Sequence, residues 1–243
     1  MAGPLRDGFG RGGLLSTSFG KQAPIGAFWP RVARAYGWWR VSRDLDGLHV
    51  AGLEGLVREV EAGPRLIVAN HVAWWDGVVA SALGHALGLE VRLVARAETL
   101  VQNPWMRHAG VIPLHGGTAV RGCVREVAQF LDRPRRVAWF FPQGRQRPDS
   151  VRPLGFQGGV RLFTDLAPTL PVALAYPFRE VEVPAVMLDF GTPITQGFEE
   201  DITARLDHIA AFVDGDPRFV ELVASRRRTQ QRGLAARLLG AAP

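Results

Sequence analysis

The stretch from Asn70 to Gly77 (NHVAWWDG) contains a histidine and a carboxylate whose spacing suits proton transfer. Asp76 follows His71 by five positions, so a loop that folds back can bring the carboxylate to one imidazole nitrogen. That hydrogen bond would fix the tautomer and leave the other nitrogen as a base. The alternative is that His71 is a structural side chain and that Asp76 caps the next helix. The spacing alone leaves both interpretations open.

The flanking segments indicate that this stretch lies at the edge of a sheet. Residues 65–69 are an apolar run typical of a buried strand, and residues 77–89 are typical of a helix. Further strands are expected over residues 91–95, 110–114, 137–141, 170–176 and 181–190. This alternation predicts a single α/β domain with a mixed, largely parallel sheet flanked by helices. His71 would then stand at the carboxyl end of a strand, where open α/β sheets place their sites.

The remaining segments have weaker patterns. Residues 48–61 are compatible with an early strand or a hairpin, and residues 98–108 with a helix that kinks at Pro104. Apolar residues at helical spacing predict a helix over residues 118–131. The C-terminal third is expected to be helical, over residues 198–213 and 217–239.

Composition restricts the class of protein. The chain has 243 residues and is 47% hydrophobic, which is enough for one domain with a sizeable core. Cys123 is the single cysteine, which excludes an internal disulfide or a cysteine metal cluster and favours a reducing compartment. No secretory signal and no apolar run of about 20 residues is found, so a cytoplasmic or peripheral protein is expected. The net charge of +6 suits anionic membranes, nucleic acid or acidic substrates alike.

Three regions are expected along the chain: an arm over residues 1–41, a catalytic domain over residues 42–215 and a basic helical tail over residues 216–243. Residues 1–24 lack periodicity and are expected to be mobile. Aromatic residues are interleaved with arginines over residues 25–41, and this composition is typical of a segment at a membrane interface. A helix packed on the catalytic core is the equal alternative.

Six blocks resemble those of the glycerolipid acyltransferase family, which includes the lysophosphatidate acyltransferases. Asn70, His71 and Asp76 match the N-H-x-x-x-x-D block of that family in full. The other blocks follow in the family's order: residues 110–114 (GVIPL), 141–146 (FPQGRQ), 156–159 (FQGG), 170–172 (LPV) and 190–194 (FGTPI). Together they extend over residues 45–195, and six blocks in register are a far more specific signal than one.

The resemblance implies the glycerolipid acyltransferase fold and an activity like that of 1-acyl-sn-glycerol-3-phosphate acyltransferases. A fatty acyl group would pass from a thioester, either acyl-CoA or acyl carrier protein, to a lipid hydroxyl. His71 would be the general base and Asp76 would orient it. The thioester would be a co-substrate, and no resident cofactor or metal is implied. The partners would be the lipid acceptor, the thioester and the inner face of a membrane, contacted peripherally.

The third block departs from the family pattern F-P-E-G-T-R. Gln143 replaces its Glu, Arg145 its Thr and Gln146 its Arg, and the family associates that Arg with the acceptor's phosphate. The candidate substrate-binding residues are Asn70, Gln143, Gly144, Arg145 and Arg147. Gln143 keeps an acceptor and a donor, so it can orient a loop or bind a substrate hydroxyl. The departures favour a neutral acceptor, such as a glycolipid or a polyisoprenoid sugar, over simple drift.

Other functions have less support. A lipid-binding module that kept the fold and lost turnover is the main alternative, because fold does not guarantee function. Nucleic-acid binding is suggested only by the basic runs at residues 133–136 and 226–228, without a recognition motif, so no nucleic-acid partner is expected. The chain lacks the G-x-S-x-G elbow of serine hydrolases and the H-E-x-x-H motif of zinc hydrolases.

Overall fold

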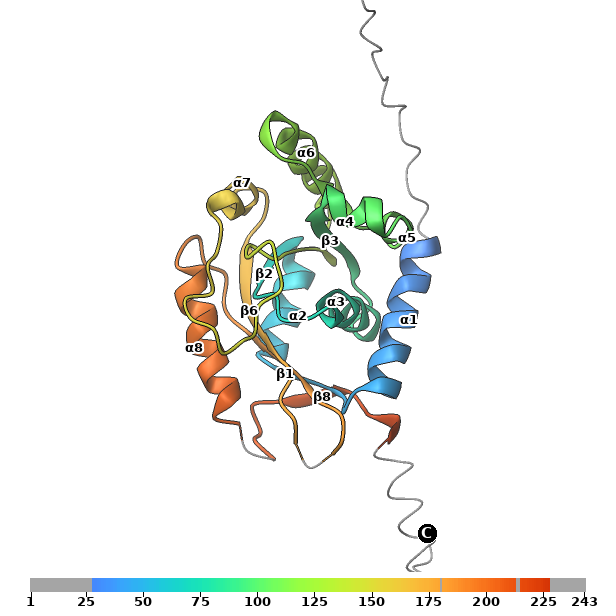
Figure 1. Ribbon diagram of the computed structural model, residues 1–243, viewed down its shortest axis with the longest axis vertical. Helices are drawn as coiled ribbons and strands as arrows, with labels where there is room; N and C mark the ends of the chain where they lie inside the picture. The colour runs from blue at the N-terminus through green and yellow to red at the C-terminus, as the bar shows by residue number, and fades with distance from the viewer. Residues whose placement is uncertain (1–27, 180, 213–214, 228–243) are drawn as a thin grey trace, which may run out of the picture.

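The computed structural model describes residues 28–179, 181–212 and 215–227. Its centre is an eight-stranded sheet in the order β4-β3-β5-β2-β6-β7-β1-β8 (Figure 1). The strands, in that order, are Ile112–Leu114, Glu90–Arg96, Arg136–Phe140, Arg65–Ala69, Thr169–Ala175, Val186–Phe190, Leu48–Ala51 and Val220–Val223. The sheet confirms the predicted mixed α/β fold.

Most neighbouring strands are parallel. β4, β3, β5, β2 and β6 run in one direction, β7 pairs antiparallel with β6, and β1 is parallel to β7. β2 lies between β5 and β6, with Ile67 opposite Trp139 on one side and Leu170 on the other. A strand buried on both sides is expected to be largely apolar, and β2 is apolar from Leu66 to Ala69, after Arg65. The carboxyl ends of these parallel strands therefore meet at the edge where His71 follows Ala69.

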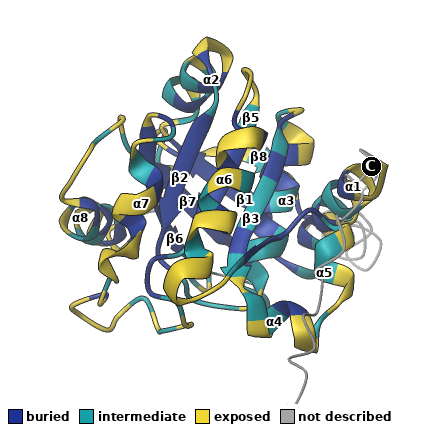
Figure 2. Ribbon diagram, turned by 90° about the horizontal axis from the view of Figure 1, so that it is seen from above, coloured by how far each residue is buried: buried dark blue, intermediate teal, exposed yellow. Residues whose placement is uncertain are grey.

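Helices cover both faces of the sheet (Figure 2). They are α1 Phe28–Asp44, α2 Leu53–Ala62, α3 Trp75–Ala86, α4 Ala97–Gln102, α5 Trp105–His108, α6 Val120–Phe130, α7 Arg161–Thr164 and α8 Phe198–Ala210. Alternation along β2 divides the core: Ile67 packs with α1, α2 and α3, whereas Leu66 and Val68 pack with α6, α7 and α8.

Two sequence-based expectations about elements need correction. Of the early strand or hairpin expected over residues 48–61, the strand is present as β1, but helix α2 follows it in place of a second strand, because Leu56 and Val60 bury one helical face. The C-terminal segment is not helical from residue 217, because Val220–Val223 pair antiparallel with β1. A short run with two valines fits an edge strand, and β1 offered an unpaired edge. Residues 228–243 and the predicted arm over residues 1–24 lie outside the described residues.

The boundary expected at residue 41 falls inside α1, which belongs to the folded body. A Cβ on Gly37 would lie 2.8 Å from Ser81 Cβ, so glycine permits the close approach of α1 to α3. Residues 98–108 form two helices, since Asn103 and Pro104 separate α4 from α5 instead of kinking one helix. Among the described residues, no helix combines the length and apolarity needed to cross a membrane.

Candidate active site

The loop after β2 is anchored by Asn70. The Asn70 side chain is 1% exposed and bonds both backbone groups of Leu174 on β6, donating to its carbonyl oxygen at 2.8 Å and accepting from its N–H at 2.8 Å. The oxygen and the nitrogen of the side-chain amide are therefore both bonded to backbone groups. Asn70 holds the carboxyl ends of β2 and β6 together.

His71 and Asp76 meet as their spacing predicts. His71 Nδ1 lies 2.6 Å from Asp76 Oδ2, and the Asp76 side chain is completely buried. The same carboxylate accepts the N–H groups of Val72 at 2.7 Å and Ala73 at 3.1 Å. These bonds point back into the loop, and the start of α3 has no side-chain cap, so Asp76 does not act as the helix cap that was the alternative. Nε2 is left as the nitrogen that can accept a proton.

Tyr176 completes the surroundings of the carboxylate. Its hydroxyl donates to Asp76 Oδ1 at 2.7 Å from just beyond the end of β6. Burial, followed by the negative charge of Asp76, raises the Tyr176 pKa well above its usual value. The hydroxyl therefore stays protonated and keeps donating. Asp76 is held from both sides, which fixes the orientation of the His71 ring.

Gln143 links the loop after β5, residues 141–147, to the loop after β2 that carries His71. It is 3% exposed, its Oε1 accepts the backbone N–H of His71, and its Nε2 donates to the Leu154 carbonyl oxygen at 3.1 Å. The Arg147 N–H adds a bond to the His71 carbonyl oxygen at 2.8 Å. The Phe141 ring stacks on His71 with centroids 4.7 Å apart. Of the two roles open to Gln143, this geometry supports orientation of the loop.

The exposed part of His71 faces a cavity of about 270 Å³, here called the His71 cavity. Its walls come from α1, α3, β3, α4, α5 and the residue 141–146 loop, and most of the side chains are apolar. They include Val78, Val91, Leu93, Met106, Val111 and Leu114. An apolar cavity with one catalytic-type polar group at its wall is a typical small-molecule site.

Of the five predicted substrate-binding residues, only Gly144 is among the residues that line the His71 cavity. Neither Arg145 nor Arg147 is among them. Arg147 Nη1 instead donates to the Leu154 carbonyl oxygen at 3.3 Å. Two arginines do line the cavity, Arg34 on α1 and Arg96 at the end of β3. The Arg96 Nη2 would lie 2.8 Å from a Cβ on Gly144.

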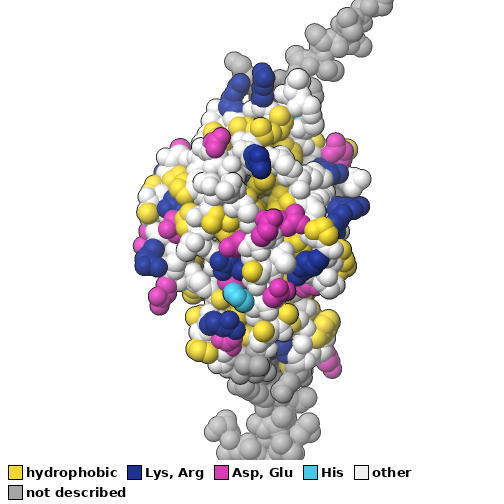
Figure 3. Space-filling view, turned by 90° about the vertical axis from the view of Figure 1, so that its left-hand side faces the viewer, with side chains coloured by type: hydrophobic (Ala, Val, Ile, Leu, Met, Phe, Trp, Pro, Cys, Tyr) yellow, Lys and Arg dark blue, Asp and Glu magenta, His cyan; other side chains and the backbone are white. Residues whose placement is uncertain are grey.

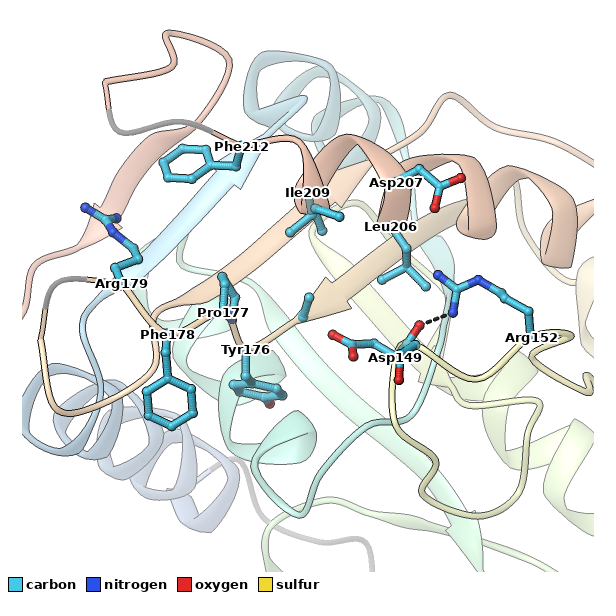
Figure 4. Close-up of a pocket in the computed structure, with 13 residues that line it drawn as sticks. Asp149, Arg152, Tyr176, Pro177, Phe178, Arg179, Leu206, Asp207, Ile209 and Phe212 are labelled. Carbon is cyan, nitrogen blue, oxygen red and sulfur yellow. Dashed lines mark hydrogen bonds between the residues drawn. The ribbon is translucent and has the colours of Figure 1, made fainter.

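A larger cleft of about 750 Å³ lies on the other side of Tyr176 (Figure 4). Its walls are the end of β6, the second half of α8 and the loop that carries Asp149 and Arg152. His71 is not part of this cleft, and Tyr176 separates it from Asp76. The His71 ring lines the smaller cavity only.

Comparison with protein families gives one match, to the family described as Acyltransferase, over residues 47–174. This range covers more than half of the chain and contains both strand-end loops. The chain belongs to the acyltransferase family. Comparison with curated proteins gives no match. The sheet, flanked by helices on both faces, fits an acyltransferase domain.

Two residues at the site of this acyltransferase were not predicted from the sequence: Tyr176, which bonds Asp76, and Arg96, which lines the His71 cavity. Tyr176 follows β6, which pairs with β2, and Arg96 ends β3, which is separated from β2 by β5; the positions of both strands were predicted. The rule that site residues gather at these strand ends would have suggested both. Which of many strand-end polar residues faces Asp76 depends on strand order, and the sequence pattern does not give that order.

Proposed function

We propose that this chain transfers a fatty acyl group from a thioester to a lipid hydroxyl, with His71 as the general base. The observation that carries the proposal is the 2.6 Å contact of His71 Nδ1 with the buried Asp76 carboxylate, at the wall of an apolar cavity. Either acyl-CoA or acyl carrier protein would supply the thioester.

The geometry of the pair supports the following reaction. His71 Nε2 takes the proton of the acceptor hydroxyl as its oxygen attacks the thioester carbonyl carbon. Asp76 stabilises the imidazolium that forms, because its carboxylate faces Nδ1. The C–S bond then breaks, and the leaving thiolate recovers the proton from His71. No covalent enzyme intermediate is needed.

The His71 cavity suits the apolar tail of a lipid substrate. Its deep walls are aliphatic side chains such as Leu93 and Val111, and burial of an alkyl chain there removes apolar surface from water. His71 and Gly144 lie in the same lining, so an acyl chain seated in the cavity would present its carbonyl carbon beside the imidazole.

The acceptor we propose is a lipid hydroxyl without a neighbouring phosphate. Both polar atoms of the Gln143 side chain bond to backbone groups, and neither Arg145 nor Arg147 lines the cavity. Residues 141–146, the block that departs from the family pattern, therefore offer little to bind a phosphate. Of the two arginines that line the cavity, Arg34 and Arg96, Arg96 lies beside Gly144 and is the one that could bind a phosphate there. Replacement Arg96→Ala should leave KM for a neutral hydroxyl lipid within about threefold; a rise of about tenfold or more for lysophosphatidate alone would assign a phosphate to Arg96.

The direct test is release of free thiol from acyl-CoA or acyl carrier protein in the presence of hydroxyl lipids. His71→Ala should lower the rate by about 10²–10⁴-fold, the range attributed to general base catalysis. Cys123 gives little background, because burial raises the pKa of its thiol to about 12. A parent protein that binds the lipids but releases no thiol would instead be a lipid-binding module. His71→Ala protein with the parent rate would refute the base assignment.

A further inference from the structure

The cleft beside Tyr176 lies outside the His71 cavity, and we call it the Tyr176 cleft. Its volume of about 750 Å³ lies within the range of about 300–1,000 Å³ that is typical of small-molecule sites. The end of β6, the second half of α8 and the loop that carries Asp149 and Arg152 surround it (Figure 4). A space of this size between three elements can hold a ligand, so the chemistry of its lining decides which ligand fits.

The charges that line the Tyr176 cleft are balanced. Two aspartates and two arginines contribute to the lining: Asp149, Asp207, Arg152 and Arg179. Arg179 Nε also lies 3.8 Å from Asp46 Oδ2, so the guanidinium groups leave no excess of positive charge. Acidic and basic side chains are likewise mixed over the side of the molecule that carries α8 (Figure 3). A phosphate would find no cluster of unopposed guanidinium groups here, and a cation would meet two of them, so the lining favours a neutral ligand.

The polar groups of the lining can make further hydrogen bonds. Arg152 Nη1 donates to the carbonyl oxygens of Asp149 and Val151, and these bonds hold the guanidinium in place. Among the residues that the structure describes, its other N–H groups have no partner, and neither have the carboxylates of Asp149 and Asp207. A hydroxyl group both donates and accepts, so a ligand with several hydroxyl groups can bond to the carboxylates and to the guanidinium at once.

Aromatic rings lie beside these polar groups. Phe178 is 72% exposed, Tyr176 is partly exposed, and both line the cleft just after the end of β6 (Figure 4). Aromatic rings offer flat apolar faces, and a sugar ring has apolar C–H faces between its hydroxyl groups, so the two pack together. Carboxylates, a guanidinium and aromatic rings in one cleft are therefore the combination that suits a sugar.

We propose that the Tyr176 cleft binds a neutral sugar, either as a free saccharide or as the headgroup of a glycolipid. Two walls of the cleft are bonded to the reactive loop. The Tyr176 hydroxyl donates to Asp76, and Arg147, two residues before Asp149, donates its N–H to the His71 carbonyl oxygen. A glycolipid headgroup in the cleft would therefore lie next to the residues that hold the catalytic pair. A role as the headgroup of the acceptor rests on the proposed acyl transfer, whereas the binding of a sugar does not.

The test is saturation-transfer-difference NMR of the full chain with methyl glucoside, methyl mannoside, methyl galactoside and myo-inositol, and with CoA as a second probe. The parent should transfer saturation to the ring protons of at least one of these neutral compounds. Phe178→Ala and Asp207→Ala should each weaken that binding about tenfold or more. The matched controls are Phe28→Ala on α1 and Glu200→Ala on α8, since both residues are exposed and neither lines the cleft. Phe178 and Asp207 are exposed as well, so all four variants should fold.

The outcomes separate sugar binding from acyl transfer. Binding that both cleft variants weaken and both controls keep supports the proposal, even if the parent releases no thiol from a thioester. Displacement of the bound sugar by a glycolipid in detergent assigns the cleft to a headgroup, and binding without such displacement assigns it to a free saccharide. A parent that binds none of the neutral compounds, or cleft variants that bind them like the parent, overturns the proposal. So would saturation transfer to CoA alone that the cleft variants abolish, because the cleft would then hold the nucleotide of the donor.

Discussion

At the scale of residues, the buried carboxylate of Asp76 organises the site. It accepts hydrogen bonds from two backbone N–H groups of its own loop and from the hydroxyl of Tyr176, and it faces His71 Nδ1. A carboxylate held by so many donors cannot rotate without losing bonds in a buried place. The His71 ring is fixed as a result, and a fixed base is what proton transfer requires.

Tyr176→Phe should impair the reaction without removing the base. We expect kcat to fall roughly tenfold, equivalent to about 1.4 kcal/mol, because Asp76 would lose one donor and hold the imidazole less firmly. The raised pKa of Tyr176 keeps the hydroxyl protonated below about pH 10, so the deficit should be equal at neutral and mildly alkaline pH. Rates measured across that range check this. A deficit that disappears at alkaline pH would mean that Tyr176 ionises.

Gln143→Glu should destabilise the protein, although Glu is the residue that the family pattern has at this place. The carboxylate can still accept the His71 N–H, but it would face the Leu154 carbonyl oxygen where Nε2 now donates. Loss of that donor in a buried site should lower the free energy of unfolding by about 1–3 kcal/mol at neutral pH. Urea unfolding measures it. Unchanged stability would show that the loop can rearrange around a charge.

At the scale of elements, the packing of α1 on α3 decides the shape of the His71 cavity, because both helices line it. Gly37 stands where they come closest. The aromatic pattern of residues 25–41 left two roles open, a membrane interface and a helix packed on the core. The structure shows α1 packed through Gly37 and Val41, with Trp29 and Tyr36 exposed. The packed role is thus present, and the exposed face remains available for a membrane.

Gly37→Ala should cost about 1–3 kcal/mol, since its Cβ would meet Ser81 Cβ and the Val78 carbonyl oxygen at 2.8 Å each. The displaced α1 should also weaken binding of the acyl thioester. Gly55→Ala on α2 is the matched control, because nothing lies within 4 Å of its Cβ. That change should be neutral or stabilise by about 0.5–1 kcal/mol. Thermal unfolding of the two variants compares them, and equal melting temperatures would contradict the close packing.

The bounds of an element could be predicted from the sequence where the whole segment is buried. β2 begins and ends at the residues expected, Arg65 and Ala69, because the four residues after Arg65 form the apolar run typical of a central strand. Prediction failed where tertiary pairing decides the conformation. Val220–Val223 form a strand only because β1 has a free edge, and that edge is set by distant parts of the chain. Local pattern could not supply this information.

At the scale of the whole molecule, some contacts of the site join residues close in sequence, and others join residues that only the fold brings together. The pair His71 and Asp76 is five residues apart, so the spacing suggested their contact, although by itself it left a structural role for both open. Tyr176 lies 100 residues from Asp76 and reaches it because β2 and β6 are neighbours. The burial of Asn70 and Gln143 was likewise hidden, since both types of side chain bind ligands as readily as backbone. The contacts support a positioning role for both residues.

The central claim is that His71, held by Asp76, moves an acyl group onto a lipid hydroxyl. Its most direct test is mass spectrometry of lipids incubated with an isotope-labelled acyl thioester and the purified protein. The account predicts a labelled ester on the lipid, formed at least about 10²-fold more slowly by His71→Ala. Label found only in free fatty acid, or an ester formed equally fast by both proteins, would contradict it.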